Sequence, residues 1–232
     1  MRATITRYPG TLPVPRWRDM KGDETMKQIA TAMLALGTML AALPAAAADA
    51  ICPPNPPVGS TVNGNLIVPP GATCLLNHVT VTGNVDVQPQ AELNVGFDSA
   101  LPQPSSTIDG NVYVGTGATL VASSGISLDL TLGGNIEANQ CNTVLLGPVI
   151  VGGNVDIQNC TGAESGYETA QIGGNFTCDD NSRCLAAFGQ VRGNMQINDN
   201  AEADVGKNTV GGNLRCQTQR GRLWQRQHGR RP

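Results

Sequence analysis

Apolar and polar residues alternate with a period of two along most of the chain, in short runs separated by glycine and asparagine. The runs share the pattern apolar-x-Gly-Asn-apolar-x-apolar, for example from Val81 to Val87 and from Val151 to Ile157. Alternate side chains of a strand point to opposite faces. We therefore expect short strands in which the first and third residues after each Asn point inward and the residue between them points outward.

The Gly-Asn pair occurs eight times, at successive spacings of 19, 27, 24, 19, 21, 19 and 19 residues. A fixed period near 20 residues is typical of stacked supersecondary units. Glycine permits a positive-φ corner before each strand, and asparagine at the same position of every unit can form a ladder of side-chain amides. The expected ladder consists of Asn65, Asn84, Asn111, Asn135, Asn154, Asn175, Asn194 and Asn213.

A weaker second strand follows in each repeat, as at residues 91–95, 118–121 and 143–146. A coil of this length has room for two or three short strands with tight corners, and longer coils carry loops. The sequence predicts an all-β fold, a single-stranded parallel β-helix or solenoid of about eight coils with a period near 19 residues. The expected outward positions are mostly polar: Ile67, Asp86, Tyr113, Glu137, Asp156, Thr177, Gln196 and Arg215.

On these repeats the chain resembles parallel β-helix proteins over about residues 60–216, in the manner of an exported bacterial solenoid. It is also distantly similar to the polymer-forming bactofilin-like solenoids, which share short coils punctuated by glycine. The chain departs from the bactofilins in having an export signal and several cysteines. The resemblance implies a fold and no particular chemistry.

The segment that precedes the repeats is typical of a secretory signal peptide, which we place at residues 26–50. Lys27 supplies a positive n-region, Ile29–Leu43 an apolar h-region, and Ala48-Asp49-Ala50 an A-x-A cleavage site. The apolar run is short for a transmembrane helix, so a retained membrane anchor is the weaker alternative.

The outermost segments do not follow the repeat. We interpret residues 1–25 as an extension upstream of the true start at Met26, because the codons for Lys21-Gly22-Asp23 can contain a bacterial ribosome-binding sequence. The alternative is an authentic, unusually long n-region. Residues 217–232 form an aberrant basic tail. A frameshift soon after Cys216 explains its character, whereas an authentic tail would contact a polyanion or a membrane surface.

Between these ends, residues 51–216 form the expected solenoid domain. Aromatic residues make up only 3% of the whole chain, which argues against a conventional globular core, while glycine is abundant at 28 residues. The domain holds fourteen acidic residues and four basic ones, so its net charge is strongly negative. An acidic domain disfavours nucleic-acid binding.

Seven cysteines in an exported chain predict disulfides. Cys141 and Cys160 each lie six residues after a ladder asparagine, so they should stack in adjacent coils about 4.8 Å apart, within the Cα range of a disulfide. The other expected bridges are Cys178 with Cys184 inside one coil and Cys52 with Cys74 at the N-terminal end. Cys216 is left over, as a free thiol or for an intermolecular bridge.

Two groups of carboxylates are the candidate sites. Glu137 and Asp156 occupy equivalent outward positions in adjacent coils, where they could do acid–base work, hold a cation or simply form a solvated acidic face. Asp179, Asp180 and Asp199 supply oxygen ligands at a corner, and Asp180 should stack on Asp199. Calcium binding is one hypothesis for this corner, and polar turn chemistry is the competing explanation.

Three other features carry little functional signal. His78 has no catalytic partner at a recognisable spacing and is expected at a surface or corner. Residues 79–82 resemble an ice-binding threonine row for one coil, but we expect no flat threonine ladder. Tyr113 is a single candidate for stacking on a carbohydrate.

The sequence favours an exported, non-enzymatic protein with a structural or surface-interaction role in adhesion, matrix or envelope. We expect it in the periplasm, on the outer surface or outside the cell, without a cofactor or a nucleic-acid partner. Contact with a cell surface or polysaccharide and end-to-end self-association through exposed β edges fit this role. The alternatives are a β-helical carbohydrate-active enzyme of the lyase or hydrolase type and a calcium-stabilised binding module.

Overall fold

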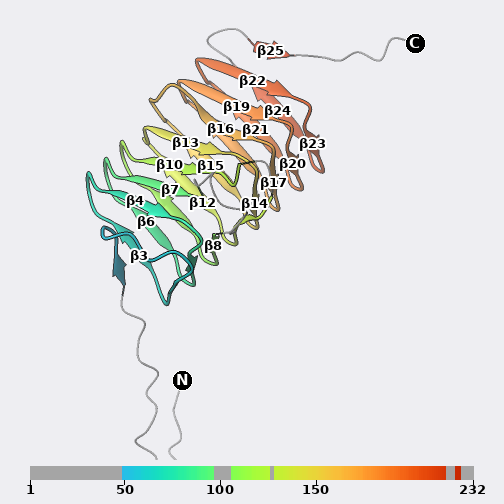
Figure 1. The fold of residues 1–232 in the computed structure, drawn as a ribbon. Helices are drawn as coiled ribbons and strands as arrows, with labels where there is room; N and C mark the ends of the chain where they lie inside the picture. The colour runs from blue at the N-terminus through green and yellow to red at the C-terminus, as the bar shows by residue number, and fades with distance from the viewer. Residues whose placement is uncertain (1–48, 97–105, 126–127, 218–222, 226–232) are drawn as a thin grey trace, which may run out of the picture. The chain divides into compact units, whose positions relative to one another are not determined.

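A computed structural model describes residues 49–96, 106–125, 128–217 and 223–225. Every strand pairing within these ranges is parallel, and no helix occurs in them. The chain visits three sheets in the repeating order A, C, B, so each coil contributes one strand to each wall (Figure 1). The expected parallel solenoid of about eight coils is confirmed. The expected extension and most of the signal peptide and basic tail lie outside the described residues.

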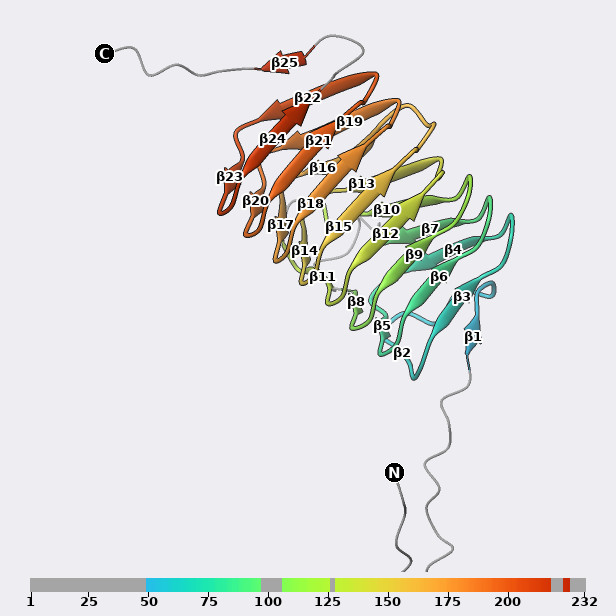
Figure 2. The same cartoon turned by 180° about the vertical axis from the view of Figure 1, so that it is seen from behind.

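Sheet A contains the strands that follow the Gly-Asn pairs and is seen face-on in Figure 2. Its strands are β1 (Ala50–Ile51), β3 (Leu66–Val68), β6 (Val85–Val87), β9 (Val112–Val114), β12 (Ile136–Asn139), β15 (Val155–Gln158), β18 (Phe176–Asp179), β21 (Met195–Asn198) and β24 (Leu214–Gln217).

Sheets C and B complete each coil. The strands of sheet C are β4 (Thr73–Leu76), β7 (Glu92–Val95), β10 (Thr119–Ala122), β13 (Thr143–Leu146), β16 (Ser165–Glu168), β19 (Arg183–Ala187), β22 (Glu202–Gly206) and β25 (Leu223–Gln225). The strands of sheet B are β2 (Thr61–Val62), β5 (Thr80–Val81), β8 (Thr107–Ile108), β11 (Leu130–Leu132), β14 (Val149–Val151), β17 (Ala170–Ile172), β20 (Gln190–Val191) and β23 (Thr209–Val210).

The core consists of columns of aliphatic side chains in register from coil to coil. In sheet A, Val85 pairs with Leu66 on one side and with Val112 on the other, and all three side chains are fully buried. The residue between two buried positions is partly or fully exposed in most of these strands, as the period-two pattern predicts. Like side chains therefore stack on like, which fills a narrow interior without large aromatic residues.

The asparagine ladder forms, and its main bond differs from the expected one. At each of the seven steps the backbone N–H of one ladder asparagine donates to the side-chain Oδ1 of the preceding one, at 2.8–2.9 Å. Direct amide-to-amide bonds, at 3.3 Å, join only the last five asparagines, from Asn135 to Asn213. The side chain of each ladder asparagine thus accepts a hydrogen bond from the backbone of the next coil, just before the strand of sheet A begins.

The repeat glycines serve close stacking, so our expectation of positive-φ corners at these positions was wrong. Only the first of them, Gly64, has a positive φ, 110°. A Cβ added to Gly110 would lie 2.5 Å from the carbonyl oxygen of Gly83 and 2.6 Å from Oδ1 of Asn84. Gly134 is equally crowded by the coil before it. The coils approach at this corner because no side chain separates the backbones.

Other residues adopt the left-handed conformation at the corners. Most of those on the corner between sheets A and C are polar, and each is followed by an inward-facing residue. The positive-φ residues of this corner are Gly71, Gln90, Gly117, Gln140, Asn159, Asp180 and Asp199. The inward column that follows them is Ala72, Ala91, Ala118, Cys141, Cys160, Asn181 and Asn200.

The predicted disulfides are present: Cys52–Cys74, Cys141–Cys160 and Cys178–Cys184. The Cα atoms of Cys141 and Cys160 lie 4.5 Å apart in adjacent coils, as the register predicts. Cys178 and Cys184 join the end of β18 to the start of β19 inside one coil. Cys216 is the free cysteine and is partly buried.

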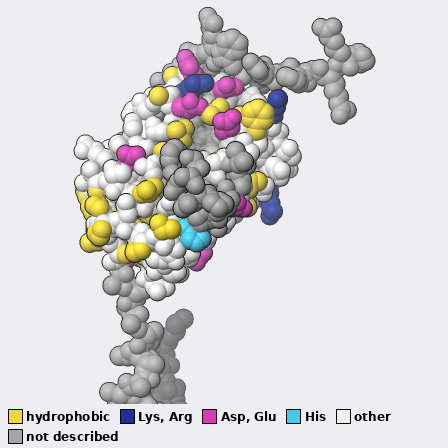
Figure 3. Space-filling view, in the orientation of Figure 1, with side chains coloured by type: hydrophobic (Ala, Val, Ile, Leu, Met, Phe, Trp, Pro, Cys, Tyr) yellow, Lys and Arg dark blue, Asp and Glu magenta, His cyan; other side chains and the backbone are white. Residues whose placement is uncertain are grey.

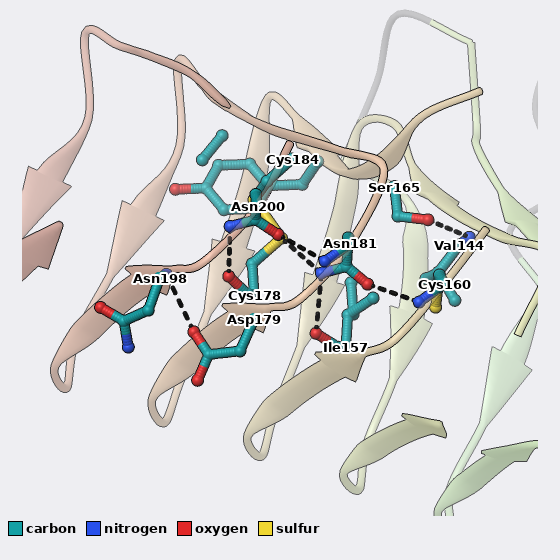
Figure 4. Close-up of a disulfide and its surroundings, with 12 residues drawn as sticks. Val144, Ile157, Cys160, Ser165, Cys178, Asp179, Asn181, Cys184, Asn198 and Asn200 are labelled. Carbon is teal, nitrogen blue, oxygen red and sulfur yellow. Dashed lines mark hydrogen bonds between the residues drawn. A yellow bond between two sulfur atoms is a disulfide. The ribbon is translucent and has the colours of Figure 1, made fainter. Parts of the chain in front are cut away.

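A second, buried asparagine ladder continues the corner column beyond the Cys141–Cys160 bridge (Figure 4). The backbone N–H of Cys160 donates to Oδ1 of Asn181 at 2.8 Å, and the N–H of Asn181 donates to Oδ1 of Asn200 at 2.9 Å. Their Nδ2 groups donate to the carbonyl oxygens of Ile157 and Cys178, respectively. Both amides are therefore satisfied inside the core, where an unpaired polar group would be costly.

The two ends of the solenoid differ. At the N-terminal end β1 covers sheet A, Oδ1 of Asn55 accepts a hydrogen bond from the N–H of Leu75 in sheet C, and Cys52 is bridged to Cys74. Residues 53–57 include four prolines, which cannot donate to a further strand. These features restrict further pairing beside sheet C, while β1 and β2 remain the terminal strands of their sheets and Ile51 is 61% exposed.

At the C-terminal end the inward positions of the last coil are open. Leu214 is 52% exposed, whereas Met195, at the equivalent position one coil earlier, is fully buried. Val210 and Cys216 are likewise more exposed than their counterparts in the preceding coil. The described strand that follows, β25, pairs with β22 in sheet C.

Candidate functional site

A shallow hollow of about 610 Å³ on the outer face of sheet A is the leading candidate site. The central row of this face runs through consecutive coils from Asp86 to Tyr113, Glu137, Asp156 and Thr177, each paired with the next. These are the outward positions expected from the sequence. Because they come from adjacent strands, their side chains form a ribbon perpendicular to the strands, on the face seen in Figure 2.

Tyr113 is the aromatic residue of this row and has a carboxylate on each side. Asp86 precedes it and Glu137 follows it in register, and 37% of Tyr113 is exposed. Nδ2 of Asn111 donates to the Tyr113 hydroxyl at 3.2 Å, which helps to hold the ring above the sheet. An exposed ring beside acceptor oxygens and amides is a surface that can stack on a sugar and bind its hydroxyl groups.

Glu137 and Asp156 are adjacent, as predicted, and line the same hollow. Oδ1 of Asp156 accepts a hydrogen bond from Nε2 of Gln158 at 2.8 Å. The described lining contains no Lys or Arg. Two neighbouring carboxylates could exchange a proton or attract a cation, but no cationic side chain in this lining is placed to stabilise an anionic transition state.

The three residues of the calcium hypothesis lie at one corner, but they take part in different interactions. Asp180 and Asp199 are stacked at equivalent positive-φ positions, as expected. The carboxylate of Asp179 accepts hydrogen bonds from Nε2 of Gln196 and from the N–H of Asn198, both at 3.0 Å. Burial raises the pKa of Asp179 despite these bonds. The described ranges contain no group of three or more His, Cys, Asp or Glu residues arranged to hold a metal ion.

Sheet B carries a threonine row, which contradicts our expectation that no threonine ladder develops. Thr61, Thr80, Thr107 and Thr131 are paired in register across four consecutive coils. The row continues through uncharged residues, namely Ile150, Gln171, Gln190 and Thr209. We missed it because we considered only the positions after the Gly-Asn pair, whereas every member of this row lies three residues before the glycine.

The other faces of the solenoid carry fewer features that could form a binding site. His78 is exposed at a positive-φ corner, as expected. Beside sheet C, Glu164 and Arg183 form an ion pair at 3.6 Å. In the view of Figure 3 charged side chains are sparse and gather toward the C-terminal coils, while apolar side chains are scattered rather than joined in one patch.

No helix in the part of the chain that the structure describes is long and apolar enough to cross a membrane. No protein-family model matches the chain, and no curated protein or solved structure matches it either. The resemblance to bactofilin-like solenoids therefore gains no support beyond the architecture. What is shown is a parallel β-solenoid with three disulfides and a polar hollow on sheet A.

Proposed function

We propose that the protein is an exported, non-enzymatic solenoid that contacts polysaccharide or another cell-surface component through sheet A. Three disulfides carry the export part of the proposal, because such bonds form and persist in oxidising compartments. Cell fractionation with non-reducing peptide mapping tests it: the oxidised chain is expected outside the cytoplasm. Recovery of only the reduced protein, in the cytoplasm, would contradict export.

The binding part rests on one observation, the exposed Tyr113 ring in a hollow bordered by carboxylates and amides. Affinity electrophoresis in gels that contain neutral, acidic or amino-sugar polysaccharides tests it. We expect at least one polymer to retard the protein and Tyr113→Ala to abolish the retardation. Phe188→Ala is the matched control, because Phe188 is an exposed aromatic residue, 50% exposed, that lies outside sheet A. Equal retardation of both variants would contradict the assignment.

We also propose a structural role, which the unequal ends of the solenoid support. The N-terminal end carries the Cys52–Cys74 bridge and a proline-rich segment, whereas the last coil carries no disulfide and the side chain of Leu214 is 52% exposed. Exposed strand edges and apolar surface favour self-association. We therefore place end-to-end contact at the C-terminal coil.

The rival function is a carbohydrate-active enzyme that uses the adjacent Glu137 and Asp156. Release of reducing sugars from a retained polysaccharide, lost in Glu137→Gln and in Asp156→Asn, would establish it. We favour binding without catalysis because the hollow is shallow and its described lining has no cationic partner for the carboxylates. A calcium-stabilised module is the third reading, and a melting temperature that falls on chelation would support it.

A further inference from the structure

The fold begins two residues earlier than the cleavage site expected after Ala50. Ala50 pairs with Leu66 in sheet A, and Ile51 pairs with Ile67. The N–H of Ala50 donates to the carbonyl oxygen of Asn65 at 2.9 Å. Ala50 also packs against the hydrophobic core over the fully buried Leu66. Residues assigned to the signal peptide are thus part of the first coil.

Asp49 occupies the ladder position of this first strand. Because Ala50 is in register with Leu66, Asp49 is in register with Asn65, the first ladder asparagine. Oδ1 of Asp49 accepts a hydrogen bond from Nδ2 of Asn65 at 2.9 Å. A carboxylate oxygen of an aspartate can accept a hydrogen bond here, as the amide oxygen of an asparagine does. A residue in the first strand of the ladder needs no side-chain N–H to donate to an earlier coil. Asp49 therefore closes the ladder at its N-terminal end.

The sequence offers three overlapping A-x-A motifs at this point, of which Ala45-Ala46-Ala47 directs cleavage after Ala47. Ala46-Ala47-Ala48 directs cleavage after Ala48, and Ala48-Asp49-Ala50 directs it after Ala50. Cleavage after Ala50 would remove Asp49, half of β1 and the cover over Leu66. Cleavage after Ala48 is the latest of these cuts that leaves every one of these contacts in place.

We propose that a signal peptidase hydrolyses the Ala48–Asp49 bond, so that the mature chain begins with Asp49. Water adds to the carbonyl carbon of Ala48 and the C–N bond breaks. The products are a carboxylate on Ala48 and an amine on Asp49, which is protonated at neutral pH. The proposal rests on the proposed export, and it adds the exact bond at which the leader is removed.

The test is the intact mass and N-terminal sequence of the protein recovered from the extracytoplasmic fraction of cells that express the full chain. The expected result is a chain that starts at Asp49. A chain that starts at Ala48, or one that starts at Ile51 and is lighter by one Asp and one Ala residue, would overturn the inference and leave export standing. An uncleaved chain retained in the cytoplasm would overturn both.

Two variants separate the motifs. Ala50→Val replaces the residue before the later bond with a branched side chain, and Val still suits a strand. We expect it to leave the Asp49 terminus unchanged. Ala46→Lys alters the first position of the motif that ends at Ala48 and leaves the motif that ends at Ala50 unchanged, and we expect loss of the Asp49 terminus. If Ala50→Val blocks cleavage while Ala46→Lys does not, the bond after Ala50 is the one that is cut and the proposal fails.

Discussion

Gly134→Ala tests whether the repeat glycines are required for close stacking of the coils. A Cβ at this position would lie 2.5 Å from Oδ1 of Asn111 and 2.5 Å from the carbonyl oxygen of Gly110. Neither atom can retreat easily, since Gly110 accepts the N–H of Gly134 and Asn111 accepts the N–H of Asn135. The substitution must therefore push two coils apart at the corner where the ladder asparagines stack.

The expected loss combines overpacking with two weakened hydrogen bonds. Inserting a methyl group into a packed site typically costs about 1–3 kcal/mol, and each hydrogen bond contributes about 0.5–1.5 kcal/mol net. Because the bonds lengthen rather than vanish, we expect Gly134→Ala to lower the free energy of unfolding by about 2–4 kcal/mol. For a domain of this size that corresponds to a melting temperature lower by roughly 4–16 °C.

Urea unfolding followed by far-UV circular dichroism measures this loss, with Gly206→Ala as the control. A Cβ at Gly206 meets nothing within 4 Å, so that variant should unfold within about 0.5 kcal/mol of the parent. Gly134→Asn adds a larger side chain at the same crowded point, so we expect it to destabilise the fold at least as much as Gly134→Ala. Equal stability of all three variants and the parent would refute the stacking argument.

Four further predictions concern other parts of the solenoid. Replacing both Cys141 and Cys160 by Ala should lower the free energy of unfolding by about 3 kcal/mol, since the bridge closes a loop with a sequence separation of 19; an unchanged urea midpoint would contradict this. Burial raises the pKa of Asp179, so its contribution to stability is present below the ordinary carboxyl pKa and is lost as pH rises through the raised value. Asp179→Asn should therefore weaken the loss of stability with rising pH in thermal melts, and an unaltered pH profile would count against it. Burial also raises the pKa of the Cys216 thiol, so iodoacetamide should label it slowly at neutral pH and faster as pH increases, with rapid neutral labelling as the contrary result. Leu214→Lys should abolish any self-association seen by analytical ultracentrifugation if the last coil is the contact; persistence of the oligomer would place the contact elsewhere.

Much of the fold could be predicted because every coil repeats one register. The Gly-Asn spacing was enough to place Glu137 beside Asp156 and Cys141 beside Cys160, since equivalent positions of adjacent coils must lie about one strand spacing apart. The same spacing, applied three residues before each glycine, would have identified the threonine row that includes Thr80. The sequence contained this information, but we applied the period only to the positions that follow each Gly-Asn pair.

Other features could not be predicted from the period alone. Asn181 and Asn200 are polar residues in a column that holds alanine and cysteine in earlier coils, so their burial depends on the backbone groups that they meet. The function of Gly110 and Gly134 depends on the distance between neighbouring backbones, and a preference for glycine is compatible with either a positive φ or close approach. Sequence patterns indicate which residue is needed but not which contact requires it.

The disulfide at the N-terminal end and the exposed inward positions of the last coil give the solenoid a direction of unfolding. In a stack whose coils contact only their neighbours, opening spreads from an end. Unfolding from the N-terminal end requires β1 to separate from β3 and the chain to open against the Cys52–Cys74 bridge, whereas the only cysteine of the last coil, Cys216, is free. Under heat or mechanical load we expect the coils to open in order from the C-terminal end, with the N-terminal coil opening last. Hydrogen exchange should therefore advance from β24 toward β3.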